Sequence, residues 1–566
     1  MALLQLAQDA FRRSHPASVM GWAAVACYAL YHKYLNKPVH PLYHFCLLLV
    51  VPAALLALLQ AIHRISVAQE CGYALFYWLV MASATVVYRI SPFHPLANYP
   101  GPLAAKISKL YLAYLTAKGR AHEDVRALHS KYGDVVRIGP NELSFNRSDA
   151  IQTIYADKTM PKGPYYVART NLAGVVQLDG VRDFKEHARR RRPWNKAMNS
   201  AAIKSYEPIV SSTASQPLGE LSRRIHNDVN ISDWMSFYGF DFMGRMVFGR
   251  EWGMLKEGRD VNDYWHTMDK CLTIVSWSSQ IPWSVPIIRL MKPPPEVLKM
   301  QKISDDSATA RLTSEGSRVK DLYYYLLNED DSSKSELTRD ECISEGVVAI
   351  VAGSDTAATA LTHLCYYLLT HPDSLKKLRQ EIEEAYPTLG SELDDLSRQA
   401  EMPYLNACIN ETLRLLPPVL TGLQRSVTAG SGAIIAGYFV PEGVDVSVHH
   451  YSVHRNSQDF SPIPDTFWPD RWLDQDAYVL PNGDVIGKGE VRTNRGAFMP
   501  FSVGPQQCAG KNLAMVELRA VACGLFRRFD LSLSERMNIC DYEKGLRDAY
   551  TTVRGPLYVK LKPRKE

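Results

Sequence analysis

The chain has 566 residues, 46% of them apolar and 22% charged, which supplies enough apolar material for a large core and excludes a mainly disordered protein. Its formal net charge of +5 is small for this length, so overall charge gives no reason to expect a nucleic-acid partner. The ten cysteines show no paired spacing, and we expect them to be reduced, as in a domain that faces the cytosol.

The first 92 residues differ in kind from the rest and are predicted to form a membrane anchor. Residues 42–62 and 71–90 are mostly apolar, and about 20 such residues are long enough to cross a bilayer. A third, weaker stretch at residues 19–30 is short for a span, so two or three transmembrane helices are expected. Buried core helices are the alternative, but those usually carry a polar face, and these stretches are apolar all round.

Residues 93–102 are predicted to be a stiff linker, because Tyr99-Pro-Gly-Pro102 cannot continue a helix. The remaining residues, 103–566, are expected to form one domain that is mainly α with small β-sheets. Strand patterns occupy 135–145, 433–449 and 557–561, and apolar residues recur at helical spacing in 188–250, 338–370, 373–386 and 403–416.

One long helix is predicted between the capping-box pair Thr338 and Glu341 and the terminating dipeptide His371-Pro372. Its middle holds Ala352-Gly-Ser-Asp-Thr356, and glycine, serine and an acid–threonine pair weaken a buried helix. From these residues alone, either a tolerated kink with a locally bonded threonine or a functional site explains the segment.

Three later motifs follow in order along the chain. Glu411 and Arg414 are three residues apart on a predicted helix, so they share one face and can pair. Alone, such a pair is most often a surface ion pair worth less than about 1 kcal/mol. Arg471 then lies in Phe-Trp-Pro-Asp-Arg-Trp, and Cys508 lies in Phe-Ser-Val-Gly-Pro-Gln-Gln-Cys-Ala-Gly.

The acid–threonine pair, the Glu-x-x-Arg helix, the Phe-x-Pro-x-Arg-Trp turn and the glycine-flanked cysteine, in this order, resemble the cytochrome P-450 family. The resemblance covers roughly residues 95–566, includes the segments 99–102 and 187–194, and is closest in style to fungal microsomal members. It implies the cytochrome P-450 fold, preceded here by transmembrane helices.

The resemblance implies haem b (iron protoporphyrin IX) as cofactor, with Cys508 as the axial ligand of the iron. Phe501 would pack beside the sulfur. Gly504 and Gly510 would let the backbone approach the porphyrin.

The resemblance also assigns the residues that hold the haem propionates. His187 and Arg191 would grip one propionate and Arg425 the other, so the basic run at 189–192 needs no nucleic-acid partner. Gln506 departs from the pattern, since the family has arginine there. Glutamine still donates a hydrogen bond, so we expect a loss of about 1 to 2 kcal/mol in haem retention.

On the opposite, distal side, the resemblance makes Asp355 and Thr356 the catalytic pair that hands protons to bound dioxygen, with Gly353 leaving room for the oxygen molecule. The structural triad behind the proximal face would be Glu411, Arg414 and Arg471. Substrate contacts are expected in the loop at 164–178 and at Val348, Ala352, Leu420, Thr421 and Tyr550.

The implied reaction is monooxygenation of a hydrophobic terpenoid, steroid, fatty or polycyclic aromatic compound, in secondary metabolism or xenobiotic oxidation. No flavin or nicotinamide motif occurs, so NADPH would act through a membrane-bound NADPH-cytochrome P-450 reductase, with cytochrome b5 as an optional second donor. The expected location is the endoplasmic reticulum membrane, with the catalytic domain facing the cytosol and substrate drawn from membrane lipid. The alternatives are an isomerase or peroxygenase of the same fold and a non-catalytic haem protein.

Overall fold

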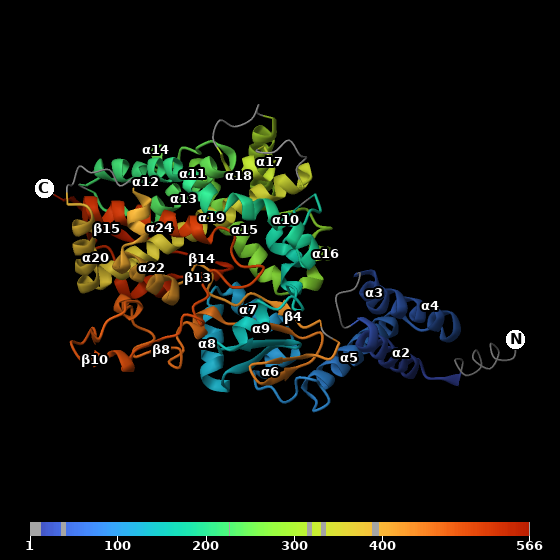
Figure 1. Ribbon diagram of the computed structural model, residues 1–566. Coiled ribbons are helices and arrows are strands. Elements are labelled where there is room, and N and C mark those ends of the chain that lie inside the picture. The colour runs from blue at the N-terminus through green and yellow to red at the C-terminus, as the bar shows by residue number, and fades with distance from the viewer. Residues whose placement is uncertain are drawn as a thin grey trace.

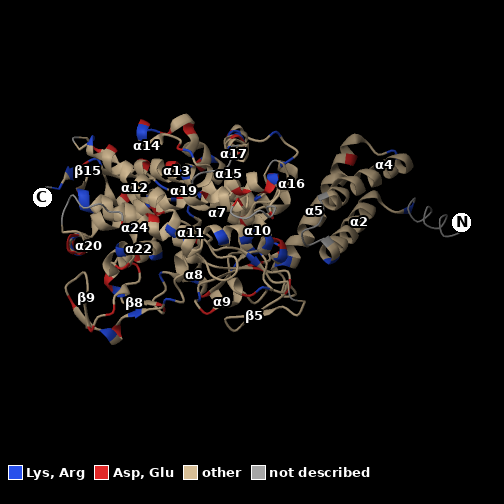
Figure 2. Ribbon diagram, turned by 45° about the horizontal axis from the view of Figure 1, so that its top comes forward, with Lys and Arg blue, Asp and Glu red and all other residues tan. Residues whose placement is uncertain are grey.

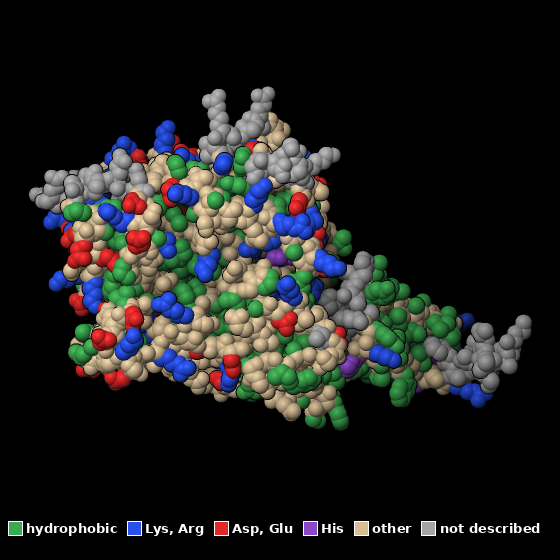
Figure 3. Space-filling view, in the orientation of Figure 1, with side chains coloured by type: hydrophobic (Ala, Val, Ile, Leu, Met, Phe, Trp, Pro, Cys, Tyr) green, Lys and Arg blue, Asp and Glu red, His purple; other side chains and the backbone are tan. Residues whose placement is uncertain are grey.

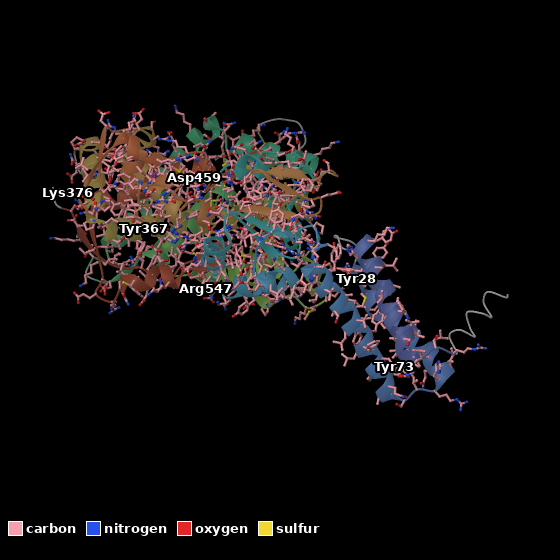
Figure 4. All side chains as sticks on the ribbon, turned by 90° about the horizontal axis from the view of Figure 1, so that it is seen from below. Tyr28, Tyr73, Tyr367, Lys376, Asp459 and Arg547 are labelled. Atoms are coloured by element: carbon pink, nitrogen blue, oxygen red, sulfur yellow. The ribbon has the colours of Figure 1, made fainter. Side chains whose placement is uncertain are left out.

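The computed structural model describes residues 13–35, 41–171, 173–225, 227–313, 320–329, 336–387, 395–428 and 430–564. A small helical N-terminal unit projects from one side of a large, mainly helical domain, and the C-terminus lies on the opposite side of that domain (Figure 1). Tyr28 and Tyr73 both belong to the projecting unit (Figure 4). All ten cysteines, each within the described ranges, are free of disulfides.

The N-terminal unit contains α2 (Pro16–Leu30), α3 (Pro41–Phe45), α4 (Val51–His63) and α5 (Val67–Ile90), with a π-helical turn joining α3 to α4. Ser66 and Gln69 form a capping box that starts α5. The helices at Leu42–His63 and Val67–Ile90 are long and apolar enough to cross a membrane, with mean hydropathies of 2.6 and 1.5. They expose most of their side chains, and few charges interrupt them (Figures 2 and 3).

The junction between α5 and the large domain is organised by Arg137, whose side chain is fully buried. Its guanidinium donates to the carbonyl oxygen of Arg89 at the end of α5 (3.1 Å) and to that of Pro140 (2.8 Å). His94 lies 3.3 Å away, and burial and then Arg137 lower the pKa of this histidine to about 4. A buried cation that is saturated by carbonyl groups ties the end of the helix to the first strand of the sheet.

The large domain is mainly helical, as the sequence predicts. Its helices are α6 (Leu103–Ile107), α7 (Leu110–Ala117), α8 (Ala121–Tyr132), α9 (Ala150–Tyr155), α10 (Phe184–Ala197), α11 (Ser200–Ser205), α12 (Glu207–Ser222), α13 (Ile231–Phe248), α14 (Met254–Glu257), α15 (Tyr264–Ser279), α16 (Val285–Ile288), α17 (Pro295–Thr313), α18 (Leu322–Leu326), α19 (Arg339–Thr370), α20 (Pro372–Ala385), α21 (Leu396–Ala400), α22 (Pro403–Leu415), α23 (His450–Val453), α24 (Lys511–Arg528) and α25 (Tyr542–Gly545).

The small β-sheets match the predicted strand patterns. One sheet has the order β1 (Val135–Gly139), β2 (Glu142–Phe145), β7 (Asp445–Val448), β4 (Arg425–Ser426), and a second has the order β12 (Phe529–Leu533), β15 (Tyr558–Pro563), β3 (Val229–Asn230). The hairpins and short pairs are β5 (Ala433–Ile435) with β6 (Tyr438–Val440), β8 (Phe460–Ser461) with β11 (Arg492–Thr493), β9 (Ala477–Val479) with β10 (Val485–Gly487), and β13 (Arg547–Ala549) with β14 (Thr551–Val553). Only the β2–β7 pairing is parallel among these described strands.

The core of the large domain is the packing of α13 against α19. The 32-residue helix α19 is also long and apolar enough to cross a membrane. It is mostly buried inside the domain, however, and is therefore a core helix. Its close contact with α13 depends on two glycines, one from each helix. A Cβ at Gly239 would overlap the Ser354 carbonyl oxygen, and a Cβ at Gly353 would overlap the side chain of Met243. The space that Gly353 leaves is therefore filled by Met243, which differs from our expectation that it accommodates dioxygen.

We predict that Gly239→Ala lowers the thermal stability of the domain by roughly 1–3 kcal/mol, because the new methyl group must separate α13 from the α19 backbone. The matched control is Gly219→Ala on the exposed face of α12, where an added Cβ meets no atom within 4 Å. The control should be neutral or stabilising by up to about 1 kcal/mol, since alanine favours helix. Equal melting curves for the two variants would contradict this account of the helix contact.

Candidate active site

Cys508 lies in the loop of residues 501–510, immediately before α24. Its backbone N–H donates to the Phe501 carbonyl oxygen at 2.9 Å, which brings the two ends of the loop together. Gly504 has a φ of +78°, and a Cβ there would overlap the Tyr155 carbonyl oxygen, so only glycine fits. At Gly510 an added Cβ would meet no atom within 4 Å. The two glycines thus differ: one packs against α9, and the other borders open space.

The Cys508 thiol is accessible, although protein atoms surround it on most sides. The side chain is exposed, yet burial raises the pKa of the thiol, as expected when the exposed surface is an interior one. The backbone N–H groups of Gly510 and Lys511 and the charge of Arg191 act in the opposite direction, towards a lower pKa. These groups would stabilise a thiolate in the same position.

A stripe of α19 is exposed although the rest of the helix is buried. Val348, Ala352 and Thr356 are spaced by one turn, and each is partly or fully accessible. The Thr356 hydroxyl donates to the Ala352 carbonyl oxygen at 2.5 Å. This is the local bond expected for a tolerated threonine, and it also leaves the hydroxyl oxygen free to accept another bond from the exposed side.

Asp355 points to a different face of α19 from Thr356, because neighbouring helix residues are about 100° apart. Its Oδ1 lies 3.3 Å from Nη1 of the buried Arg554. Arg554 also donates to the hydroxyl groups of Thr359 and, at 2.6 Å, of Ser236 on α13. The other oxygen, Oδ2, is buried without a hydrogen-bond partner in the described part of the chain. Arg554 therefore holds one oxygen of the Asp355 carboxylate, and the other oxygen can accept a hydrogen bond.

The residues expected to contact the haem propionates, His187, Arg191 and Arg425, lie close enough for their charges to interact. Arg425 is 1% exposed and His187 is 4% exposed. Burial, followed by the charges of Lys162, Arg191 and Arg425, lowers the pKa of His187 to about 3. Both side-chain atoms of Gln506 are buried and, among the described residues, unpaired. Arg191 and Arg425 have no ion-pair partner among the described residues, and the two propionates of haem fit that requirement.

The four arginines of the run on α10 have four different partners. Arg189 pairs with Glu341, and the buried Arg190 pairs with the fully buried Glu345, both on α19. Arg191 donates to the Gln507 carbonyl oxygen at 2.8 Å, and Arg192 pairs with Glu336 on the surface. The run therefore joins α10 to α19 and to the cysteine loop.

Glu411, Arg414 and Arg471 form a buried ionic group. The Glu411 carboxylate accepts from Arg414 Nε at 2.8 Å and from Arg471 Nε at 3.1 Å. The backbone N–H of Trp468 and the indole N–H of Trp472 complete its hydrogen bonds. Burial alone would raise the pKa of Glu411, but the two arginines outweigh it and hold this pKa below its usual range.

This ionic group is connected to the cysteine loop through His454. The His454 Nδ1 lies 3.1 Å from the Arg414 carbonyl oxygen, and its Nε2 accepts from the Met499 N–H at 3.0 Å. Burial lowers the pKa of His454 well below its ordinary value, so the ring is neutral and can donate at one nitrogen and accept at the other. Met499 is two residues from Phe501, so the connection ends at the loop that carries Cys508.

A small hollow, with a cavity volume of about 50 Å³, lies between the four-stranded sheet, α7, α15 and the hairpin β13–β14. Among the residues described as lining it, neither Cys508 nor Val348, Ala352 or Thr356 of α19 appears. Of the expected substrate residues, Thr421 and Tyr550 line it, and Tyr165 and Tyr166 represent the loop at 164–178. Leu420 is 1% exposed and belongs to the main apolar core, whereas the adjacent residues Val419 and Thr421 line the hollow.

Sequence reasoning did not find Lys162, Arg554 or Asp548. Lys162 is 5% exposed beside Arg425, and burial lowers the pKa of its ammonium to about 7. Its sequence context, Met160-Pro-Lys-Gly-Pro164, is typical of a surface turn, and only the two prolines hint at a fixed conformation. Arg554 and Asp548 belong to no motif, so only the three-dimensional contacts show them.

The sequence and these contacts agree with comparisons to known proteins. The family profile described as cytochrome P-450 matches residues 100–561. The cytochrome P-450 monooxygenase orf5 of Eupenicillium brefeldianum is 31% identical over 497 residues, covering 87% of this chain and 96% of the relative. The monooxygenases astJ of Aspergillus oryzae (33% identity; 85% and 94% coverage) and FCK2 of Fusarium pseudograminearum (30%; 89% and 88%) are similar over comparable lengths.

Proposed function

This chain belongs to the cytochrome P-450 family of monooxygenases, and from that membership we propose that Cys508 ligates haem b and that the enzyme oxygenates a hydrophobic small molecule. The observation that carries the proposal is the accessible thiol of Cys508, which lies within reach of the charge of Arg191, a cation that has no acid partner among the described residues. Haem, when bound, supplies the activation of dioxygen, and thiolate ligation favours O–O cleavage.

The cation cluster holds the propionates in this proposal. His187, Arg191 and Arg425 take the roles expected from the sequence, and we add Lys162 as a fourth donor. Gln506 donates from its amide, which is otherwise unpaired among the described residues. Lys162 compensates for the arginine that Gln506 replaces, because it supplies a positive charge next to Arg425.

On the distal side, Thr356 holds a proton at its hydroxyl group and passes it towards the exposed face of α19. Asp355 replenishes that proton, and Arg554 fixes the orientation of its carboxylate. Val348 and Ala352 border the same face and would contact the substrate. Since Asp355 and Thr356 have separate partners, transfer between them requires a water molecule or a rotation of one side chain.

The electrons are proposed to come from NADPH through a membrane-bound NADPH-cytochrome P-450 reductase, with cytochrome b5 as an optional second donor. The substrate is proposed to be a terpenoid, steroid, fatty or polycyclic aromatic compound of secondary metabolism or a xenobiotic. The apolar wall of the hollow, which includes Leu112, Val125 and Ile138, supports a hydrophobic substrate.

The proposed location is the endoplasmic reticulum membrane, with the large domain on the cytosolic side. Two apolar surfaces support it. The helices Leu42–His63 and Val67–Ile90 are candidate spans. In addition, Trp283, Leu290 and Met291 around α16 are 61%, 88% and 64% exposed, and α16 lies on the side of the large domain that faces the anchor (Figures 1 and 2).

We predict that Cys508→Ala abolishes the thiolate-type Soret band of the reduced carbon monoxide complex, because the proposed ligand of the iron is removed. The control is Cys540→Ala at an exposed site, which should keep the band. Absence of the band from the unmodified protein, reconstituted with haem, would sink the function itself. Its persistence in Cys508→Ala would refute the ligand assignment.

We predict that Thr356→Ala retains the band but diverts reducing equivalents to hydrogen peroxide, because the distal proton donor is lost. Thr362→Ala is a matched control, since its hydroxyl makes the same backward bond to α19, to Ala358 at 2.7 Å, and is buried. The ratio of peroxide formed to NADPH used measures the effect. An unchanged ratio in Thr356→Ala would rule out the relay.

We predict that deletion of residues 1–90 moves the protein from the detergent-extracted fraction into the soluble fraction, because both candidate spans are removed. If the truncated protein still requires detergent, the patch around α16 holds it, and Leu290→Glu with Met291→Glu should then release it. Protease protection of intact microsomes tests the side of the membrane: a large domain that resists added protease would contradict the cytosolic orientation.

A further inference from the structure

The hollow beside the four-stranded sheet carries acidic and aromatic groups but no basic one. Among the residues described as lining it, none is lysine or arginine, whereas Glu142 and Asp548 are acids and Tyr165, Tyr166 and Tyr550 are aromatic. His449 also lines it, but burial lowers the pKa of this ring well below its ordinary value, so it is neutral. The chemistry of the wall is therefore that of a site for a cation.

The two acids of the hollow differ in whether they are already paired. Glu142 forms an ion pair with Lys109 and accepts a hydrogen bond of 2.8 Å from Gln424. Asp548 is 3% exposed, and its Oδ2 is buried with no hydrogen-bond partner in the described residues. Hydrogen bonds from the Thr421 hydroxyl and the Tyr550 N–H lower the pKa of the Asp548 carboxyl, and no cation contributes to this pKa. Asp548 is therefore a buried acceptor that faces the hollow with one oxygen unused.

The tyrosine rings surround this acid from two elements. Tyr165 meets Tyr166 edge to face at 5.5 Å and stacks on Tyr550 at 6.3 Å between centroids. Burial is the main cause of the raised pKa of Tyr165, and the nearby charge of Asp548 raises this pKa further. Tyr550 has a φ of +76° at the tip of the hairpin β13–β14, and this strained conformation directs its ring into the hollow.

Two cations of the protein already lie over rings of this group, and one of them is Lys162, at 5.6 Å from the centroid of Tyr166. The Arg169 guanidinium lies 3.9 Å from the centroid of Tyr550, and its charge is balanced by Asp179, at 3.6 Å. Arg547, at the start of β13, is exposed at the surface of the domain (Figure 4). Aromatic faces beside an unpaired carboxylate are the usual recognition elements for an ammonium group.

We propose that the substrate carries a positively charged nitrogen, which Asp548 binds together with the ring of Tyr165. The apolar remainder would extend along β14, which contacts α19 through the hydrogen bond of 3.5 Å from the Thr359 hydroxyl to the Thr552 carbonyl oxygen. The inference rests on the proposed function, since it names the substrate class of the same site. Binding of this kind would fix which carbon atoms reach Thr356, because one end of the molecule is held at a charge.

The test uses a probe that cannot ligate iron through nitrogen: phenylbutyl-trimethylammonium, with its neutral isostere in which the nitrogen is replaced by carbon. Dissociation constants are measured by calorimetry on the full-length, haem-loaded protein in detergent. We expect the cation to bind at least about tenfold more tightly than the isostere in the unmodified protein. Asp548→Asn should remove that preference without weakening the isostere, and Asp484→Asn in an exposed turn should leave it intact.

The pH dependence adds an independent readout. Burial raises the pKa of Asp548 to about 7, and the quaternary probe itself does not titrate. Cation binding requires the carboxylate, so affinity should fall as the pH is lowered through about 7, and Asp548→Asn should flatten the curve. Tyr165→Leu should weaken binding of the cation but leave the pH dependence of its affinity unchanged.

The outcomes separate this inference from the proposed function. A normal thiolate-type carbon monoxide band with no preference for the cation would overturn the inference alone. Equal preference in Asp548→Asn and unmodified protein would also overturn it, since the acid would then have no part in binding. Tighter binding of a matched neutral alcohol than of the cation would assign Asp548 to a hydroxyl group and reject the charged nitrogen.

Discussion

The buried Glu411 carboxylate, shared by two arginines, is the constraint on which the proximal half of the domain depends. Removing three charged groups from water costs several kcal/mol per ion, and only a full set of hydrogen bonds offsets this. Glu411 has that set, from Arg414, Arg471 and both neighbouring tryptophans. Because the partners lie on α22 and in the segment at 466–472, the ionic group fixes two otherwise separate parts of the chain.

Positive charge on α10 joins this helix to α19 and to the cysteine loop. Arg189 and Arg190 are neutralised by acids of α19, so they hold two helices together. Arg191 and Arg425 have no acid partner in the described structure and share their region with Lys162 and His187. The first two arginines thus contribute to folding, whereas Arg191, the next residue on the same helix, remains available to an anionic cofactor.

Local patterns account for what the sequence could predict. The helix from Arg339 to Thr370, its capping box and the pairing of Glu411 with Arg414 follow from spacing alone. Local patterns could not reveal Arg554, Lys162 and Asp548, because their partners are distant in sequence. The sequence around each of them contains no motif and resembles a surface loop. The sequence indicates that position 353 requires glycine. Whether Met243 or a ligand fills the space beside it depends on packing, which the sequence does not show.

The interlocked glycines of α13 and α19 have a consequence for how such an enzyme can diversify. Since Gly239 meets the backbone of α19 and Gly353 meets Met243, neither helix can slide without collision. New substrate preferences can then arise through side chains of the loop at 164–178 and of the hairpin β13–β14 that line the hollow. The fold therefore separates an inherited, nearly immutable oxidising scaffold from a small set of positions that selection can vary freely.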